Sequence, residues 1–155
     1  MNTKQKGSTA ERELIHKFWK TGTWAALRAA GSGSTQHPCP DLIASNGTRI
    51  LVIECKSVSG GYVRVEKEQA EELKTFATLF GAETWVGARY AKDTTKESHG
   101  EGWYFFSLED LRESEKGYSM NIQEALYKGL SFEELINLKI SPNERFKNTT
   151  IQKLM

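Results

Sequence analysis

The chain has 155 residues, of which 26% are charged and 10% aromatic, and a formal net charge of +1, values typical of one soluble globular domain. No apolar run approaches the ~18 residues of a membrane span, and residues 1–6 lack the apolar core of a signal peptide. Two cysteines are too few for a disulfide framework, so we expect an intracellular protein of the cytoplasm or nucleoid with reduced thiols and no membrane contact.

The N-terminal part of the chain is basic although the whole chain is nearly neutral. We expect residues 1–7 to form a flexible basic arm, which carries Lys4 and Lys6. Across residues 1–28 there are six basic side chains and only two acidic ones, Glu11 and Glu13. Such a bias fits either a partner with a phosphate backbone or a solvated surface helix.

A helix is predicted to open at Ser8, because the sequence Ser8-Thr9-Ala10-Glu11 has the spacing of a capping box. Leu14 and Phe18 follow Glu11 on the same stripe of this helix. Glu11 is therefore either a capping acid or a carboxylate turned toward the core side, where an active site could use it. The spacing leaves both interpretations open.

Residues 23–30 are a predicted strand, interrupted near its end by Arg28, which is either a surface or ion-paired residue or a phosphate contact. Residues 31–40 form a Gly/Ser-rich loop that runs into Asp41. His37, Cys39 and Cys55 lack the paired spacing of a zinc site, so we interpret the two cysteines as small, buried or half-buried residues.

The strongest pattern is a hairpin that starts at Asp41 and ends in an acidic strand. Residues 42–52 indicate a strand, a tight turn at Asn46-Gly47 and a second strand. Such a hairpin can place Asp41 near Glu54, and strand alternation puts Glu54 and Lys56 on one face. Two carboxylates and a lysine at one point suit a divalent hard cation and a water molecule that attacks a substrate.

The rest of the chain alternates strands and helices. We expect a strand at 62–65, a helix at 67–80, strands at 83–90 and 102–107, short helices at 108–111 and after Ser131, and a loose tail over about 139–155. This order predicts a mixed sheet covered on both faces within one domain. The aromatic strand around Trp103 and Phe106 either fills the core or forms an interface between subunits.

Pro40-Asp41 followed by Glu54-Cys55-Lys56 resembles the signature of the PD-(D/E)xK nucleases, and the surrounding order is similar to the archaeal Holliday junction resolvases. The resemblance covers nearly the whole chain. Its other matching segments are Lys6-Gly7-Ser8, Glu11-Arg12-Glu13-Leu14, Arg28-Ala29-Ala30-Gly31-Ser32, Val63-Arg64-Val65-Glu66-Lys67-Glu68-Gln69-Ala70-Glu71 and Gly129-Leu130-Ser131-Phe132-Glu133-Glu134-Leu135.

The resemblance implies a restriction-endonuclease-like α/β fold, in which a mixed β-sheet is flanked by helices and residues 1–155 form a single nuclease domain. It implies that Asp41, Glu54 and, directly or through water, Glu11 bind Mg²⁺, with Mn²⁺ as a substitute and the Cys55 carbonyl as a further ligand. Lys56 would activate the attacking water. The remaining family positions, which bind DNA or assist cleavage, are Arg12, Arg28, Ser32 and, near the site, Gln69; Lys4 and Lys6 of the arm would add backbone contacts.

The resemblance also implies a function and its partners. The expected activity is paired, metal-dependent hydrolysis of phosphodiesters in a four-way DNA junction by a homodimer, because a two-fold junction needs two symmetric nicks. A sliding clamp or branch-migration helicase is a further possible partner. Two alternatives stay open: a restriction- or repair-type endonuclease of the same superfamily that acts on duplex DNA, and a junction-binding module without catalysis.

Overall fold

The computed structural model describes residues 3–29, 36–90 and 102–139, with side chains from residue 9 onward. Its main element is a five-stranded mixed sheet in the order β1-β2-β3-β5-β6. The central pair β3 and β5 is parallel, and the three outer pairings are antiparallel. The strands are β1 Ala25–Arg28, β2 Leu42–Ser45, β3 Ile50–Val58, β5 Glu83–Tyr90 and β6 Trp103–Phe106. The predicted mixed α/β fold is confirmed.

A second, three-stranded antiparallel sheet was not predicted. It contains β4 Tyr62–Glu66, β8 Gly117–Asn121 and β7 Arg112–Ser114, in that order. Gly117 has a φ of 142°, and a Cβ atom at this position would collide with the carbonyl oxygen of Val65. Glycine is therefore required where β8 meets β4.

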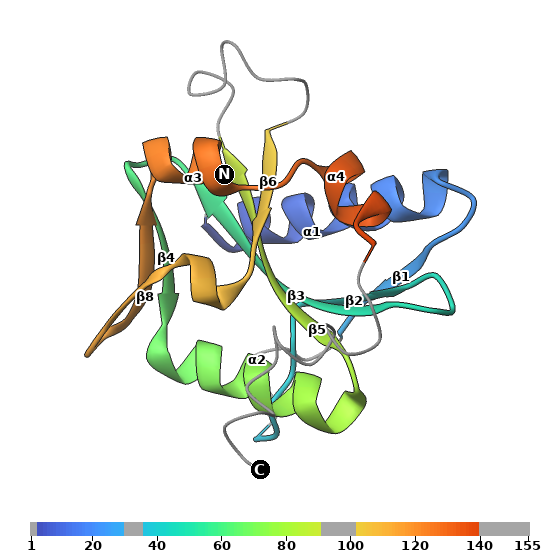
Figure 1. The fold of residues 1–155 in the computed structure, drawn as a ribbon, viewed down its shortest axis with the longest axis horizontal. Helices are drawn as coiled ribbons and strands as arrows, with labels where there is room; N and C mark the ends of the chain where they lie inside the picture. The colour runs from blue at the N-terminus through green and yellow to red at the C-terminus, as the bar shows by residue number, and fades with distance from the viewer. Residues whose placement is uncertain (1–2, 30–35, 91–101, 140–155) are drawn as a thin grey trace.

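The two long helices cover opposite faces of the main sheet (Figure 1). Helix α1 Thr3–Lys20 packs its buried Leu14 and Phe18 on one face. Helix α2 Lys67–Phe80 and the small sheet cover the other face, and α2 ends at Gly81 in the left-handed conformation. The predicted start of the first helix at Ser8 was wrong, because residues 3–7, which we expected in an arm, continue the helix toward the N-terminus.

The C-terminal part of the described chain adds three short helical elements. They are the 3₁₀ helix η2 Leu108–Asp110, α3 Ile122–Lys128 and α4 Phe132–Asn137. The Ser131 hydroxyl accepts a hydrogen bond from the Glu134 amide at 3.1 Å and so caps α4. Nearly all of the predicted loose tail lies outside the described residues. Within the described part of the chain, no helix is long and apolar enough to cross a membrane.

The aromatic strand belongs to the core. Trp103 is 4% exposed and Phe105 and Phe106 are fully buried, so the core interpretation of this strand is confirmed and the interface interpretation is wrong for these side chains. Phe105 and Phe132 pack with ring centroids 6.4 Å apart, which joins α4 to the face of the sheet that α1 covers.

A buried ion pair ties the hairpin to β5 and α4. Arg49 donates to both carboxylate oxygens of Glu83 at 2.9 Å and to the Leu135 carbonyl at 2.7 Å. The Trp85 indole donates to the same carboxylate at 3.2 Å. The two charges are paired with each other and hydrogen-bonded to neighbouring groups. Both side chains can therefore be buried without leaving a charge unpaired.

Candidate active site

The β2–β3 hairpin brings the two predicted acids together. Leu42 pairs with Ile53 in the antiparallel register, so the preceding Asp41 lies opposite Glu54. The Asp41 carboxylate accepts a hydrogen bond from the Cys55 amide at 2.9 Å, which fixes it at the end of the sheet. The predicted proximity of the two carboxylates is confirmed, because Asp41 hydrogen-bonds to the Glu54 side chain.

Lys56 completes the cluster on the same face of β3. Its ammonium lies 3.4 Å from a Glu54 carboxylate oxygen and donates to the Gln69 side-chain carbonyl at 2.8 Å. Gln69 sits in the first turn of α2, where the same oxygen also accepts from the Glu66 amide at 3.4 Å. The start of α2 therefore holds the lysine in place beside the acids.

Glu54 is buried beside the half-buried Asp41, so the site disfavours negative charge on both carboxylates at once. Glu54 is 8% exposed, and burial followed by the neighbouring Asp41 raises its pKa from 4.5 to about 8, although Lys56 opposes the shift. A divalent cation bound here would counter both causes of the raised Glu54 pKa. Its positive charge would stabilise the buried carboxylate in place of water and would offset the repulsion from Asp41. The oxygen donors of Asp41 and Glu54, with the Cys55 carbonyl between Glu54 and Lys56 in sequence, fit a hard metal ion.

Glu11 lies near this cluster but pairs with a different residue. It forms an ion pair with Arg28, and burial and then Asp41 raise its pKa, while Arg28 lowers it. The capping interpretation of Glu11 was wrong, because α1 begins at Thr3 and Glu11 lies well inside it. Among the described residues, no group of three or more His, Cys, Asp and Glu side chains has the arrangement of a metal cage, so Glu11 as a metal ligand stays a prediction.

The other predicted site residues are exposed, packed into the sheet, or outside the part of the chain that the structure describes. Arg12 is exposed on α1, next to Glu11 in sequence, and the Arg28 side chain is 47% exposed at the end of β1. The side chain of Cys55 packs against the α1 side of the sheet. Cys39 and Cys55 are half-buried free thiols, as predicted. Ser32 lies outside the described residues, as do the side chains of Lys4 and Lys6, although both lysines belong to α1.

Sequence reasoning missed a second polar contact between α1 and the main sheet. Glu13 accepts hydrogen bonds from Arg89 at 2.8 Å and from the Trp103 indole at 3.1 Å. Arg89 is opposite Ser57 in the parallel register of β3 and β5, one residue beyond Lys56. The sequence does contain a signal for this contact. Arg89 is a lone arginine near the end of an otherwise largely apolar strand, which is the same pattern that marked Arg28 as a candidate.

Comparisons with known proteins identify the family. The family model for the archaeal Holliday junction resolvase (Hjc) matches residues 2–143. The crossover junction endodeoxyribonuclease Hjc of Archaeoglobus fulgidus is 37% identical over 124 residues, which cover 80% of this chain and 83% of that protein. The Hjc of Sulfolobus acidocaldarius is 37% identical over 138 residues, or 88% and 90% of the two chains.

The fold agrees with the sequence comparisons. The solved structure of Archaeoglobus fulgidus Hjc, a Holliday junction resolvase from an archaeal hyperthermophile, superposes with a TM-score of 0.70 at 33% identity, covering 81% of this chain and 94% of that chain. A family-model match across most of the chain and relatives above 30% identity lead to one conclusion. The chain belongs to the archaeal Holliday junction resolvase family.

Proposed function

We propose that this chain is an endonuclease that resolves four-way DNA junctions by metal-dependent hydrolysis of phosphodiester bonds. The observation that carries the proposal is the contact between the buried Glu54 and Asp41 with the Lys56 ammonium 3.4 Å from Glu54. A buried carboxylate beside a second acid is costly to maintain, and binding of a divalent cation would compensate for that cost. Membership of the resolvase family supports the junction as substrate.

The proposed resident metal is Mg²⁺, with Mn²⁺ as a substitute, held by Asp41, Glu54 and the Cys55 carbonyl. When bound, the metal lowers the pKa of a coordinated water and offsets the charge that builds up on the phosphate. The ammonium of Lys56, fixed by Gln69, orients the attacking water toward the phosphorus atom. Arg28 and Arg12, on adjacent elements, bind the phosphate backbone that flanks the scissile bond.

A homodimer follows from the symmetry of the substrate, and α2 offers a surface for it. Its C-terminal half exposes Leu79 (85%) and Phe80 (50%), and Phe80 stacks on Phe76 with ring centroids 5.1 Å apart. Adjacent exposed apolar side chains at a helix end are typical of a subunit interface. We propose that two copies pack through these α2 residues around a two-fold axis, with Trp103 and Phe106 buried inside each subunit.

The interface prediction is tested by Phe80→Glu, which places a carboxylate on the proposed two-fold contact. We expect the variant to stay folded and to shift from dimer to monomer in analytical ultracentrifugation, because a buried unpaired charge opposes association. Tyr127→Glu is the matched control, since Tyr127 is 89% exposed on α3 and lies outside the proposed interface. A Phe80→Glu protein that remains dimeric would contradict the assignment of the interface to α2.

The nuclease proposal is tested by Asp41→Asn, assayed for junction cleavage and junction binding in parallel. The substitution removes a metal ligand and leaves the basic side chains in place, so cleavage should fall to background while binding persists. Glu109→Gln, which alters an exposed carboxylate on η2, is the control and should cleave normally. Cleavage by Asp41→Asn at the normal rate would refute the metal assignment.

A further inference from the structure

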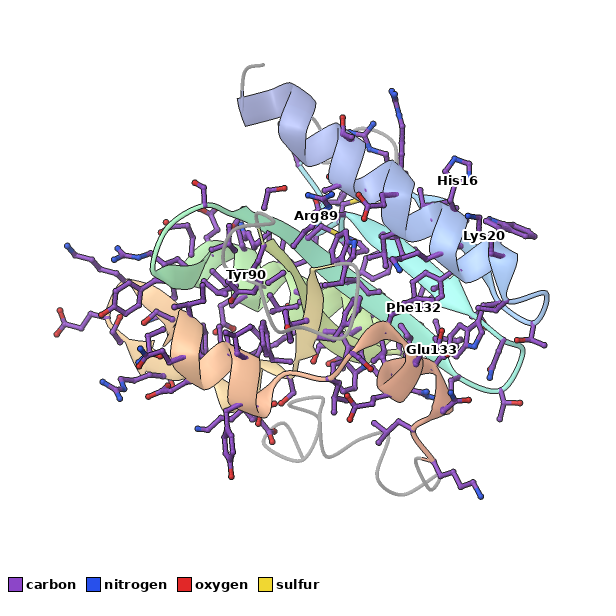
Figure 2. All side chains as sticks on the ribbon, turned by 90° about the horizontal axis from the view of Figure 1, so that it is seen from above. His16, Lys20, Arg89, Tyr90, Phe132 and Glu133 are labelled. Carbon is purple, nitrogen blue, oxygen red and sulfur yellow. The ribbon has the colours of Figure 1, made fainter. Side chains whose placement is uncertain are left out.

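A large cleft lies between α1, the end of β5 and the start of α4, apart from the acid pair. Its volume is about 800 Å³, within the range of ligand-binding pockets. Figure 2 shows His16 and Lys20 on α1 at one side of this region, and Phe132 and Glu133 on α4 at the other. Lys17 and Arg89 also line the cleft.

The cleft is lined by a small excess of basic over acidic side chains. Its basic lining residues are His16, Lys17, Lys20 and Arg89, and its acidic ones are Glu13 and Glu133. Glu13 is already engaged, because one carboxylate oxygen accepts from Arg89 and the other from the Trp103 indole. Lys20 is exposed at the rim of the cleft and is therefore the cation that an incoming ligand reaches most directly.

Lys17 lies in the cleft beside an aromatic ring and charges of both signs. Its ammonium lies 5.2 Å from the centroid of the Phe132 ring. Burial lowers the pKa of Lys17 and the nearby Lys20 lowers it further, whereas Glu13 and Glu133 raise it. Burial is the largest of these effects, so an anion bound beside Lys17 and Lys20 would restore part of the solvation that the Lys17 ammonium has lost.

The cleft continues a line of basic residues that starts beside the candidate active site. Arg12, His16 and Lys20 follow one another at four-residue intervals on α1, and all three are exposed. Eight residues of α-helix span about 12 Å. DNA carries one phosphate per strand for about each 3.4 Å of its axis, so this line matches three to four nucleotides of one strand.

We propose that the cleft is a second phosphate-binding subsite, where Lys17, Lys20 and His16 hold a backbone phosphate of the junction DNA away from the scissile bond. The inference rests on the proposed function, because it takes the ligand to be the DNA that enters the acid pair. Lysine and imidazole side chains contact phosphate oxygens without reading bases, which suits an enzyme that recognises the shape of a junction. The subsite would set the direction in which one DNA arm leaves the active site along α1.

The test is a salt titration of junction binding by the full chain in EDTA, followed by fluorescence anisotropy. Lys20→Gln removes one phosphate contact, so the slope of log affinity against log salt should become shallower by about 0.9 and the affinity should fall about eightfold at about 0.1 M salt. Lys20→Glu should weaken binding further. Lys116→Gln makes the same charge change at an exposed residue between β7 and β8, outside the cleft, and should bind like the original chain.

Two results would overturn the subsite. The first is an unchanged slope and affinity for Lys20→Gln; the second is an equal loss for Lys20→Gln and Lys116→Gln, which would indicate a general charge effect. Titration with dAMP, followed by the amide resonances of α1, distinguishes the source of the phosphate. Micromolar dAMP binding that Lys20→Gln abolishes, without any change in junction affinity, would assign the cleft to free nucleotides instead of DNA. A chain that shows the Lys20 effect but never cleaves would refute the nuclease proposal and leave the subsite intact.

Discussion

Replacing Glu54 by glutamine should make the metal-free protein more stable while it abolishes cleavage. Glutamine keeps the size of the side chain and removes the charge that is buried beside Asp41. Glu54 has a pKa raised from 4.5 to about 8, chiefly by burial and then by Asp41. The carboxylate therefore reduces the stability of the fold that it serves, as is common for residues retained for function.

The size of the effect follows from the shift and depends on pH. Between pH 4.5 and about 8 the folded chain keeps a proton on Glu54 that the unfolded chain has released, so the free energy of unfolding falls as pH rises. The slope is about 1.4 kcal/mol per pH unit, which gives a cost of about 3 kcal/mol at pH 7 and about 5 kcal/mol once pH exceeds the folded pKa. Below pH 4.5 the residue costs nothing, because both states are protonated.

Urea unfolding of the original chain, Glu54→Gln and Glu109→Gln in EDTA at several pH values between 5 and 8 measures this cost. Glu54→Gln should gain stability over the original chain progressively as pH rises, whereas Glu109→Gln, at an exposed carboxylate, should follow the original chain. Added Mg²⁺ should stabilise the original chain at pH 8 and have a smaller effect on Glu54→Gln. Parallel stability curves for all three proteins across this pH range would refute the reasoning.

Two further substitutions test contacts that support the fold and the site. Arg49→Ala leaves Glu83, 1% exposed, without its partner, so the free energy of unfolding should fall by about 3–5 kcal/mol in urea denaturation; a loss below 1 kcal/mol would contradict the assigned role of the pair. Gln69→Ala removes the hydrogen bond that holds Lys56, so single-turnover cleavage should slow by about 10–100-fold at unchanged stability. Gln123 is exposed on α3, and Gln123→Ala is the control. Equal cleavage rates for the two variants would show that Gln69 does not position Lys56 for catalysis.

Local patterns predicted the part of the chain that builds the acid pair. The Asn46-Gly47 turn joins two strands of matched apolar pattern, and their register follows from the turn, so Asp41 and Glu54 could be placed together from the sequence. Strand alternation likewise put Lys56 beside Glu54. Helix α2 was predicted with its bounds, because its apolar spacing and the glycine at its end are both local signals.

Contacts between distant segments were beyond such patterns. Ser8 and Glu11 have the spacing of a capping box, but the preceding residues continue the helix, and Glu11 instead pairs with Arg28 on β1. The Arg49–Glu83 pair joins residues 34 positions apart, and neither is marked by its neighbours. The strands β7 and β8 are short, and β8 is recognisable as a strand only once β4 is seen beside it.

The central claim is that the acid pair makes this chain a junction-resolving nuclease. Its most direct test is Mg²⁺-dependent cleavage of a synthetic four-way junction beside a linear duplex of the same sequence. We expect paired, symmetric nicks in the junction and none in the duplex. Equal cutting of both substrates would retain the nuclease site and contradict junction selectivity, and tight junction binding without cutting in either Mg²⁺ or Mn²⁺ would contradict the nuclease claim itself.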